Sequence, residues 1–191
     1  RSSDLDEDLV LKGSGSAYFG EIPPLSPFDV PIGTIFAGGL AVTSGNVTLR
    51  VGDNINTHAN SRIWATHDIV IFGDWMNLDP GYGSTMVFRG DITAGYLVDG
   101  NNSPPYLTRI FGNSDVDTIW FGDPSGISMG NQPGDDGYIH LGSQPRVYGS
   151  ASATPSTNDG EDRFVVHYLQ TMNVAAGHTL TLDGQAGSDS Y

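Results

Sequence analysis

The chain of 191 residues contains no cysteine, one lysine and only three glutamates. Without cysteine it has no disulfide framework, no thiolate nucleophile and no cysteine-ligated zinc. No apolar run reaches the length of about 18 residues that a membrane-spanning helix needs. The sequence therefore predicts neither a disulfide-stapled domain nor a protein that spans a membrane.

Basic residues are scarce as well. Lys and Arg together number 8 against 22 Asp and Glu, which gives a formal net charge of -14. Nucleic-acid binders carry a cationic surface that displaces the counterions of phosphate groups, so this balance excludes nucleic acid as a partner. Asp outnumbers Glu by 19 to 3. Asp is the carboxylate that is typical of turns and of sites for hard cations such as calcium.

Turn-forming residues are abundant, with 26 Gly and 11 Pro, while 38% of the residues are hydrophobic and 16% are charged. This composition is too apolar for a disordered chain and too rich in turn formers for a helical one. Apolar and polar residues alternate in several short segments, as in Val47, Leu49 and Val51, which indicates strands with one buried face. We expect strands in residues 8–12, 34–42, 47–51, 62–66, 68–72, 85–88, 92–98, 106–111, 118–121, 138–141, 146–148, 163–169 and 178–182.

These segments predict an all-β fold, a β-sandwich of the jelly-roll type with long Gly-, Pro- and Asp-rich loops. No internal repeat is strict enough to indicate a solenoid or a propeller. The sequence Gly-Ser-Gly-Ser at residues 13–16 has the composition of a flexible leash after the first strand. We therefore expect an N-terminal strand arm and leash in residues 1–16 and a single sandwich domain in residues 17–191.

Catalytic motifs are missing from the sequence. It has no nucleophile elbow, no zinc-protease helix, no Walker loop and no dinucleotide fingerprint. The five histidines are scattered, and His67 and Asp68 are neighbours whose side chains would point to opposite faces of a strand. We expect that the chain is not an enzyme.

Carbohydrate binding or cleavage is the alternative function. A glycosidase needs only two carboxylates at the right separation, and tryptophan rings stack on sugars as well as filling cores. Exposed coplanar aromatic rings near paired carboxylates would identify this alternative. The residues available for it are the carboxylates Glu21, Asp68, Asp74 and Glu161 and the rings of Trp64, Trp75 and Trp120.

Hard oxygen ligands cluster in four short segments of the chain. None of the four has the spacing of an EF-hand loop. Each cluster is also explained by a solvated turn, but across four clusters we expect at least one bound calcium ion. The candidate ligands are Asp4, Asp6, Glu7, Asp115, Asp117, Asp135, Asp136, Asp159, Glu161 and Asp162.

The first quarter of the chain resembles known extracellular fibre subunits. It has an acidic strand at residues 4–12, the segment GSGSAYFG at residues 13–20 and the run GTIFAGGL at residues 33–40. Together they are similar to the start of the camelysin-type fibre subunits and of the cannula-forming proteins of hyperthermophilic archaea. The resemblance implies an exported subunit whose N-terminal strand inserts into a gap in a neighbour's sheet, with calcium involved in assembly. Having a single lysine departs from the lysine-rich composition of hyperthermophile proteins.

Together these observations predict a structural subunit of an extracellular filament or tube, a homopolymer that grows by insertion of its N-terminal strand. Two glycosylation sequons, at residues 46–48 and 101–103, fit an exported protein. Supplying a strand in trans satisfies an open sheet edge without leaving backbone groups unpaired. The alternative is an ordinary first strand that pairs within its own domain. The donor-strand residues would be Leu5, Leu9, Val10 and Leu11.

Overall fold

The computed structural model describes residues 9–13, 17–19, 35–37, 40–41, 46–52, 54–57, 62–65, 67–75, 81–95, 106–113, 115–122, 139–141, 144–150, 160–167, 169–170 and 179–191. These residues form 17 strands and no helix. In the same ranges, no helix is long and apolar enough to cross a membrane.

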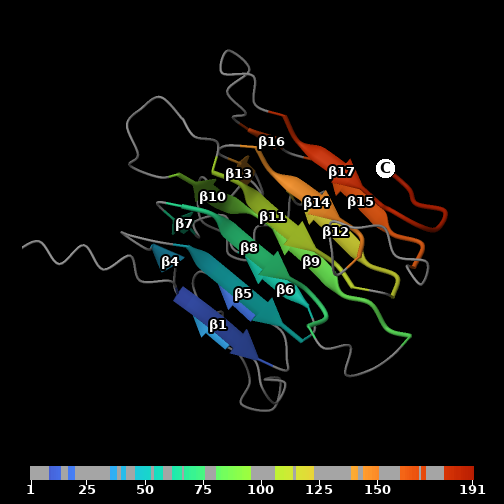
Figure 1. The fold of residues 1–191 in the computed structure, drawn as a ribbon, viewed down its shortest axis with the longest axis horizontal. Coiled ribbons are helices and arrows are strands. Elements are labelled where there is room, and N and C mark those ends of the chain that lie inside the picture. The colour runs from blue at the N-terminus through green and yellow to red at the C-terminus, as the bar shows by residue number, and fades with distance from the viewer. Residues whose placement is uncertain are drawn as a thin grey trace, which may run out of the picture.

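The strands form three sheets, A, B and C (Figure 1). In spatial order, sheet A contains β1 (Leu9–Gly13), β5 (Val47–Val51), β8 (Ile69–Phe72), β11 (Thr108–Phe111), β14 (Arg146–Tyr148) and β17 (Thr181–Asp183). Sheet B contains β15 (Arg163–Val166), β12 (Thr118–Phe121), β9 (Thr85–Phe88), β6 (Ile55–Thr57), β2 (Ala17–Phe19) and β3 (Ile35–Ala37). Sheet C contains β16 (Leu169–Gln170), β13 (Ile139–Leu141), β10 (Gly90–Ala94), β7 (Arg62–Ala65) and β4 (Leu40–Ala41).

From β3 onward the chain visits the sheets in a strict cycle, B, C, A, and each return adds the neighbouring strand of that sheet, except that β2 lies between β3 and β6 in sheet B. Every ladder between the described strands is parallel, as in the pairing of β5 with β8 and of β8 with β11. A chain that circulates through three parallel sheets in this way is a three-sided parallel β-helix. Successive coils differ in length. Asn46 and Asp68 occupy the same corner in successive coils and are 22 residues apart in the sequence. Asp68 and Leu107, at the same corner of the next pair of coils, are 39 residues apart.

The mostly-β prediction is confirmed for the described residues, but the jelly-roll arrangement is wrong for them. A jelly roll is built from antiparallel Greek keys, whereas the ladders here are parallel. The alternation of Val47, Leu49 and Val51 shows that one face is buried, and it says nothing about the direction of the neighbouring strand. Coils of unequal length also hide the structural repeat from a search for a fixed period.

Inward-facing side chains fill the helix. In sheet A the register stacks Leu49, Ile71, Ile110 and Val147 in one column, and each is at most 1% exposed. Burying each such side chain contributes about 1.5–3 kcal/mol before ordering costs. On sheet B, the rings of Phe88 and Phe121 stack inside the helix with centroids 5.7 Å apart. The core is therefore a set of columns that run along the helix axis.

The N-terminal strands are part of this helix. Leu9, Val10 and Leu11, which the sequence suggested as donor-strand residues, lie in β1 and pair in register with Val47, Thr48 and Leu49 of the same chain. Leu5 lies outside the described residues. In sheet B, β2 lies between β3 and β6, two strands that both follow it in the sequence. The pairing within one chain is the arrangement of the alternative interpretation, in which the first strand belongs to its own domain.

Candidate functional site

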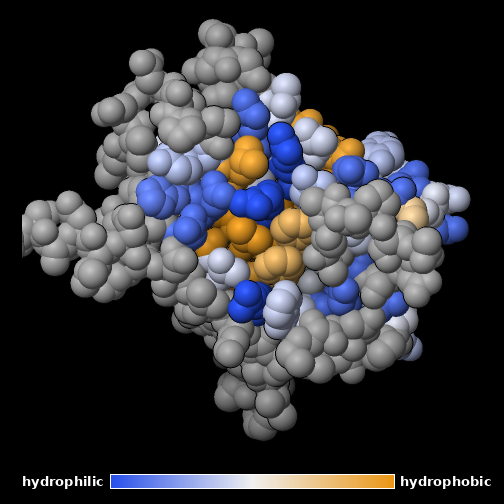
Figure 2. Space-filling view, viewed as in Figure 1, coloured by the Kyte–Doolittle hydropathy of each residue, from blue (hydrophilic) through white to orange (hydrophobic). Residues whose placement is uncertain are grey.

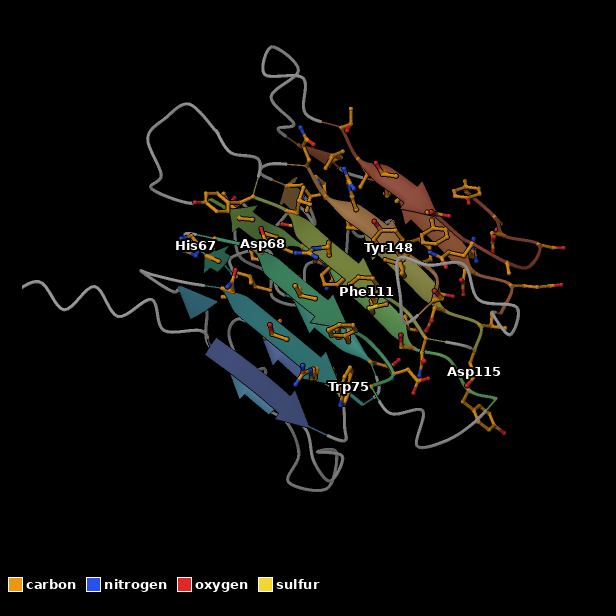
Figure 3. The ribbon with its side chains drawn as sticks, in the orientation of Figure 1. His67, Asp68, Trp75, Phe111, Asp115 and Tyr148 are labelled. Atoms are coloured by element: carbon orange, nitrogen blue, oxygen red, sulfur yellow. The ribbon has the colours of Figure 1, made fainter. Side chains whose placement is uncertain are left out.

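The outer face of sheet A carries an ordered set of polar and aromatic side chains, and it faces the viewer in Figure 3. Because alternate residues of a strand point to opposite faces, the register produces two outward columns along the helix axis. One column contains Thr48, Val70, Arg109, Arg146 and Thr181, and the other contains Arg50, Phe72, Phe111, Tyr148 and Asp183.

Aromatic rings in the second column form a continuous ladder. Phe72 and Phe111 stack with centroids 4.9 Å apart, and Phe111 and Tyr148 with centroids 5.1 Å apart. Each pair contributes about 0.5–1.5 kcal/mol beyond its buried area. The rings stack along the axis, so they present their edges outward, and Phe111 and Tyr148 are each only 7% exposed. This ladder is not the set of exposed ring faces that a sugar-stacking platform requires.

Trp75 closes one end of the ladder. Its ring is tilted by 60° against Phe72, and the guanidinium of Arg50 lies 4.6 Å from the Trp75 centroid. A cation over an indole ring contributes about 0.5–2 kcal/mol. Trp75 is therefore engaged by its own chain. The side chain of Trp64 is not described, and Trp120 lies on sheet B beneath the guanidinium of Arg163.

His67 and Asp68 lie together at the start of β8 (Figure 3) but have separate partners. The His67 ring stacks on Tyr106 with centroids 5.1 Å apart. Asp68 forms an ion pair with Arg109 and accepts the Leu107 N–H at 2.9 Å. The two residues thus serve the packing of the corner, and Asp68 neutralises part of the charge of Arg109.

A second ordered set lies at the corner that follows sheet A, where the strands give way to sheet B. We name it the aspartate ladder, and it consists of Ser84, Asp117, Asp162 and Asp189. Ser84 N–H donates to Asp117 Oδ1 at 2.6 Å, Asp117 N–H to Asp162 Oδ1 at 2.8 Å, and Asp162 N–H to Asp189 Oδ1 at 3.0 Å. Each aspartate therefore accepts a hydrogen bond from a backbone N–H of the preceding coil. Without the carboxylate, this N–H would have no partner at the bend, because the backbone pairing of the strands does not reach it.

A column of glycines faces this ladder. Gly73, Gly112, Gly149 and Gly184 directly follow the last residues of β8, β11, β14 and β17. A Cβ at Gly73 would lie 2.6 Å from Ser84 Oγ, and a Cβ at Gly112, Gly149 or Gly184 would overlap the carboxylate of Asp117, Asp162 or Asp189. Glycine is needed here because the carboxylates occupy the space that a side chain would fill.

Asp117 is the most enclosed acid of the ladder, with no exposed surface. Burial raises the pKa of Asp117, the hydrogen bonds from Ser84 and Asn113 lower it, and the nearby charge of Asp115 raises it. The net direction of the pKa is upward from the ordinary value of 3.8, because desolvation of the carboxylate outweighs the hydrogen bonds it accepts.

This raised pKa predicts a pH dependence of stability. The unfolded chain loses the Asp117 proton near pH 3.8, whereas the folded chain keeps it to higher pH. The contribution of Asp117 to the free energy of unfolding therefore falls as pH rises from that value through the folded pKa. Asp117→Asn cannot ionise, so we expect its unfolding free energy, measured in urea, to improve relative to the parent chain between about pH 4 and pH 7.

The amide that Asp117→Asn introduces keeps an oxygen for Ser84 but faces the Asn113 N–H with a donor. This adds a cost of about 1–3 kcal/mol that is independent of pH. The test is therefore the difference between the two pH profiles and not the absolute stability of the variant. Two parallel profiles over this range would contradict the upward shift.

Four of the ten predicted calcium ligands lie in the described part of the chain. Asp117 and Asp162 are brought together in the aspartate ladder, Asp115 accepts the Gly81 N–H at 3.0 Å, and Glu161 is exposed. Among the described residues, no three acidic or histidine side chains are grouped so that they could hold a metal ion. The other candidate ligands lie outside the described residues, namely Asp4, Asp6, Glu7, Asp135, Asp136 and Asp159.

The carboxylates considered for glycoside cleavage do not form a described pair. Asp68 is engaged by Arg109, and the buried Asp74 accepts the Asn113 amide at 3.1 Å. Glu21 lies outside the described residues. The sequence interpretation missed the three arginines of the outer face of sheet A, Arg50, Arg109 and Arg146, which are far apart in the chain and share this face only through the coil register.

In the sequence, the recurring pairs Phe72-Gly73, Phe111-Gly112 and Tyr148-Gly149 are the signal from which the coils of the β-helix could have been recognised.

Comparison of the chain with protein-family models, curated proteins and solved structures finds no significant match. Function is therefore inferred from the residues and their arrangement.

Proposed function

We propose that the chain is a non-catalytic structural subunit of an extracellular filament, joined to its neighbours by exchange of its N-terminal strands β1 and β2. The observation that carries this proposal is the position of β2 between β3 and β6. A strand that enters a sheet between two later strands occupies a slot, and an identical strand from another copy fits the same slot.

The slot is defined by its register. Ala17 pairs with Ile35 on one side and with Ile55 on the other, so both edges of β2 are hydrogen-bonded. β1 similarly adds one strand to sheet A beside β5. If β1 and β2 leave together, two sheets lose a strand, and the exposed edges of β3, β6 and β5 become templates for the same segment of another copy. The energetic contacts are identical in cis and in trans, which is the condition for domain swapping.

The connection to β3 is long enough for such an exchange. Residues 20–34 join β2 to β3, and 15 residues span at most about 50 Å when extended. Four prolines in this segment, at positions 23, 24, 27 and 31, disfavour a helix and favour extended backbone. Exchange from each copy to the next is heterologous, and it gives an open filament where the rotation between successive copies does not close a ring.

Calcium is part of the proposal as an assembly aid. A chain with a net charge of -14 repels its copies, and a divalent cation between carboxylates offsets that repulsion. The acidic residues that precede β1, Asp4, Asp6 and Glu7, place ligands beside the exchanging segment in the sequence. Assembly in a chelator is therefore expected to be slower or weaker than assembly in calcium.

Cross-linking between single-cysteine variants tests the exchange, because the chain has no cysteine of its own. Tyr18 in β2 pairs with Asn56 in β6, and neighbouring strands lie about 4.8 Å apart. Tyr18→Cys and Asn56→Cys are unfolded, mixed, refolded with calcium or with chelator, and treated with a short bis-maleimide. We expect covalent heterodimers in the mixture, together with filaments in electron micrographs.

The matched control is the pair Thr48→Cys and Val70→Cys, which occupy paired positions of β5 and β8. These two strands lie in the central part of sheet A, so their pairing stays within one chain and the mixture should give no heterodimer. Filaments without Tyr18–Asn56 heterodimers would show that the N-terminal strands stay in cis, and the exchange proposal would fail.

A further inference from the structure

The outer face of sheet A gathers positive charge in a strongly acidic chain. The structure describes five arginine side chains, and three of them, Arg50, Arg109 and Arg146, lie on this face. Its described carboxylates are Asp68, which is paired with Arg109, and Asp183. The local balance is therefore positive although the net charge of the chain is -14. Figure 2 shows this face, where deeply hydrophilic side chains lie beside an apolar strip.

Two of the arginines occupy neighbouring positions where their positive charges repel each other. Arg109 and Arg146 are paired in register on β11 and β14, and adjacent strands are only about 4.8 Å apart. Like charges at such neighbouring positions destabilise a sheet. Arg146 is exposed and forms no ion pair with a described residue. An anionic group bound between the two guanidinium groups would relieve this repulsion.

The hydrogen-bonding capacity that a ligand can reach lies on the exposed Arg146 and on the half-exposed guanidinium of Arg109. Arg50 Nε and Arg109 Nε have no hydrogen-bond partner among the described residues, but they are buried and face away from a ligand on this surface. A guanidinium presents its donors as a planar fork that matches a carboxylate or a sulfate group. Arg109 and Arg146 lie in one outward column, and Arg50 lies in the other, the column of Phe111 and Tyr148. From β5 to β14 the three arginines cover three strand spacings along the helix axis, or about 14 Å.

We infer that the outer face of sheet A binds an acidic polysaccharide that runs along the helix axis. The anionic groups of such a chain meet the arginines, and its hydroxyl groups lie over Thr48 and Thr181, the threonines of the face. A nucleic acid fits less well. Double-stranded DNA carries one charge per about 1.7 Å, and the overall negative charge of the protein repels so dense a polyanion. This binding does not depend on exchange of the N-terminal strands.

Binding of polygalacturonate tests the inference, with dextran as the neutral polysaccharide and single-stranded DNA as the other polyanion. Arg146→Gln removes an exposed charge and leaves the core untouched. We expect the parent chain to bind polygalacturonate at low salt, with weaker binding to dextran and to DNA. Arg146→Gln should weaken polygalacturonate binding about tenfold, as expected for loss of a charge-assisted hydrogen bond.

Arg163→Gln is the matched control, since Arg163 is also exposed but lies on the outer face of sheet B, over Trp120. It makes the same change in net charge and should alter binding less than about twofold. The inference is overturned if polygalacturonate does not bind, if dextran or DNA binds as tightly, or if Arg163→Gln weakens binding as much as Arg146→Gln.

Discussion

Gly149→Ala is expected to lower the melting temperature by about 4–24 °C, given a cost of about 2–6 kcal/mol and a shift of about 2–4 °C per kcal/mol in a chain of this size. The reason is steric. A Cβ at position 149 would overlap Asp162 Oδ2 and would lie 2.9 Å from the carbonyl oxygen of Gly184. Asp162 is only 1% exposed, so its carboxylate has no free space into which it can retreat.

The energetic cost has two parts. Overpacking a dense site costs about 1–3 kcal/mol. Displacing the Asp162 carboxylate also removes the acceptor of the Asp117 N–H, and a buried unsatisfied donor costs about 1–3 kcal/mol more. Since domains unfold with free energies of about 5–15 kcal/mol, the sum is a large share of the total stability.

Gly81→Ala is the matched control for backbone strain. Gly81 has a φ of +93° and nothing within 4 Å of a Cβ position, so alanine there costs only the strain of the left-handed conformation, about 1–2 kcal/mol. Thermal unfolding followed by circular dichroism compares the two variants. A melting temperature for Gly149→Ala at or above that of Gly81→Ala would show that the glycine column does not pack against the aspartates.

Local sequence patterns located several strands well. Residues 47–51, 85–88, 118–121 and 146–148 were expected as strands, and these are the bounds of β5, β9, β12 and β14. Alternation of buried and exposed residues is a local property, and so it survives in a single sequence. The direction of pairing is decided by the connections, which lie mostly in segments of turn-forming residues that suit parallel and antiparallel folds equally.

The coil repeat was harder to see for a physical reason. A parallel β-helix needs each strand to return in register, but it accepts insertions of different length at its corners. Gly112 precedes Asp117 by five residues, whereas Gly149 precedes Asp162 by thirteen. The glycine and the aspartate of this contact are therefore separated by different numbers of residues in different coils, so the sequence shows no fixed period.

The residues of the candidate site also divide into those that the sequence indicates and those that only the fold brings together. Asp117 and Asp162 could be chosen from the sequence because they stand in acidic clusters, but their role in the structure is to accept backbone N–H groups of the preceding coil. Arg50, Arg109 and Arg146 have no local signature at all. Their shared face depends on the register of β5, β8, β11 and β14, which becomes known only with the fold.

Deleting residues 1–19 is expected to abolish filament assembly completely. The deletion removes β1 and β2 together, so β3 and β6 lose the strand that lies between them. Joining β3 directly to β6 would require a shift of about 4.8 Å, one strand spacing, and β4 is tied to β3 by only two intervening residues while it pairs with β7. We therefore expect the truncated chain to keep its later coils and to leave the slot open.

A synthetic peptide spanning residues 9–19 should bind the truncated chain and raise its melting temperature, because ligand that binds only the folded form stabilises it by mass action. Deleting residues 1–8 is the control, since it removes the acidic segment and leaves both strands. That variant should still form filaments visible by electron microscopy. Loss of assembly on deleting residues 1–8 would assign the junction to the acidic segment. Persistence of filaments after deleting residues 1–19 would show that the N-terminal strands do not join the subunits, because the slot between β3 and β6 would then have no strand to receive from any copy.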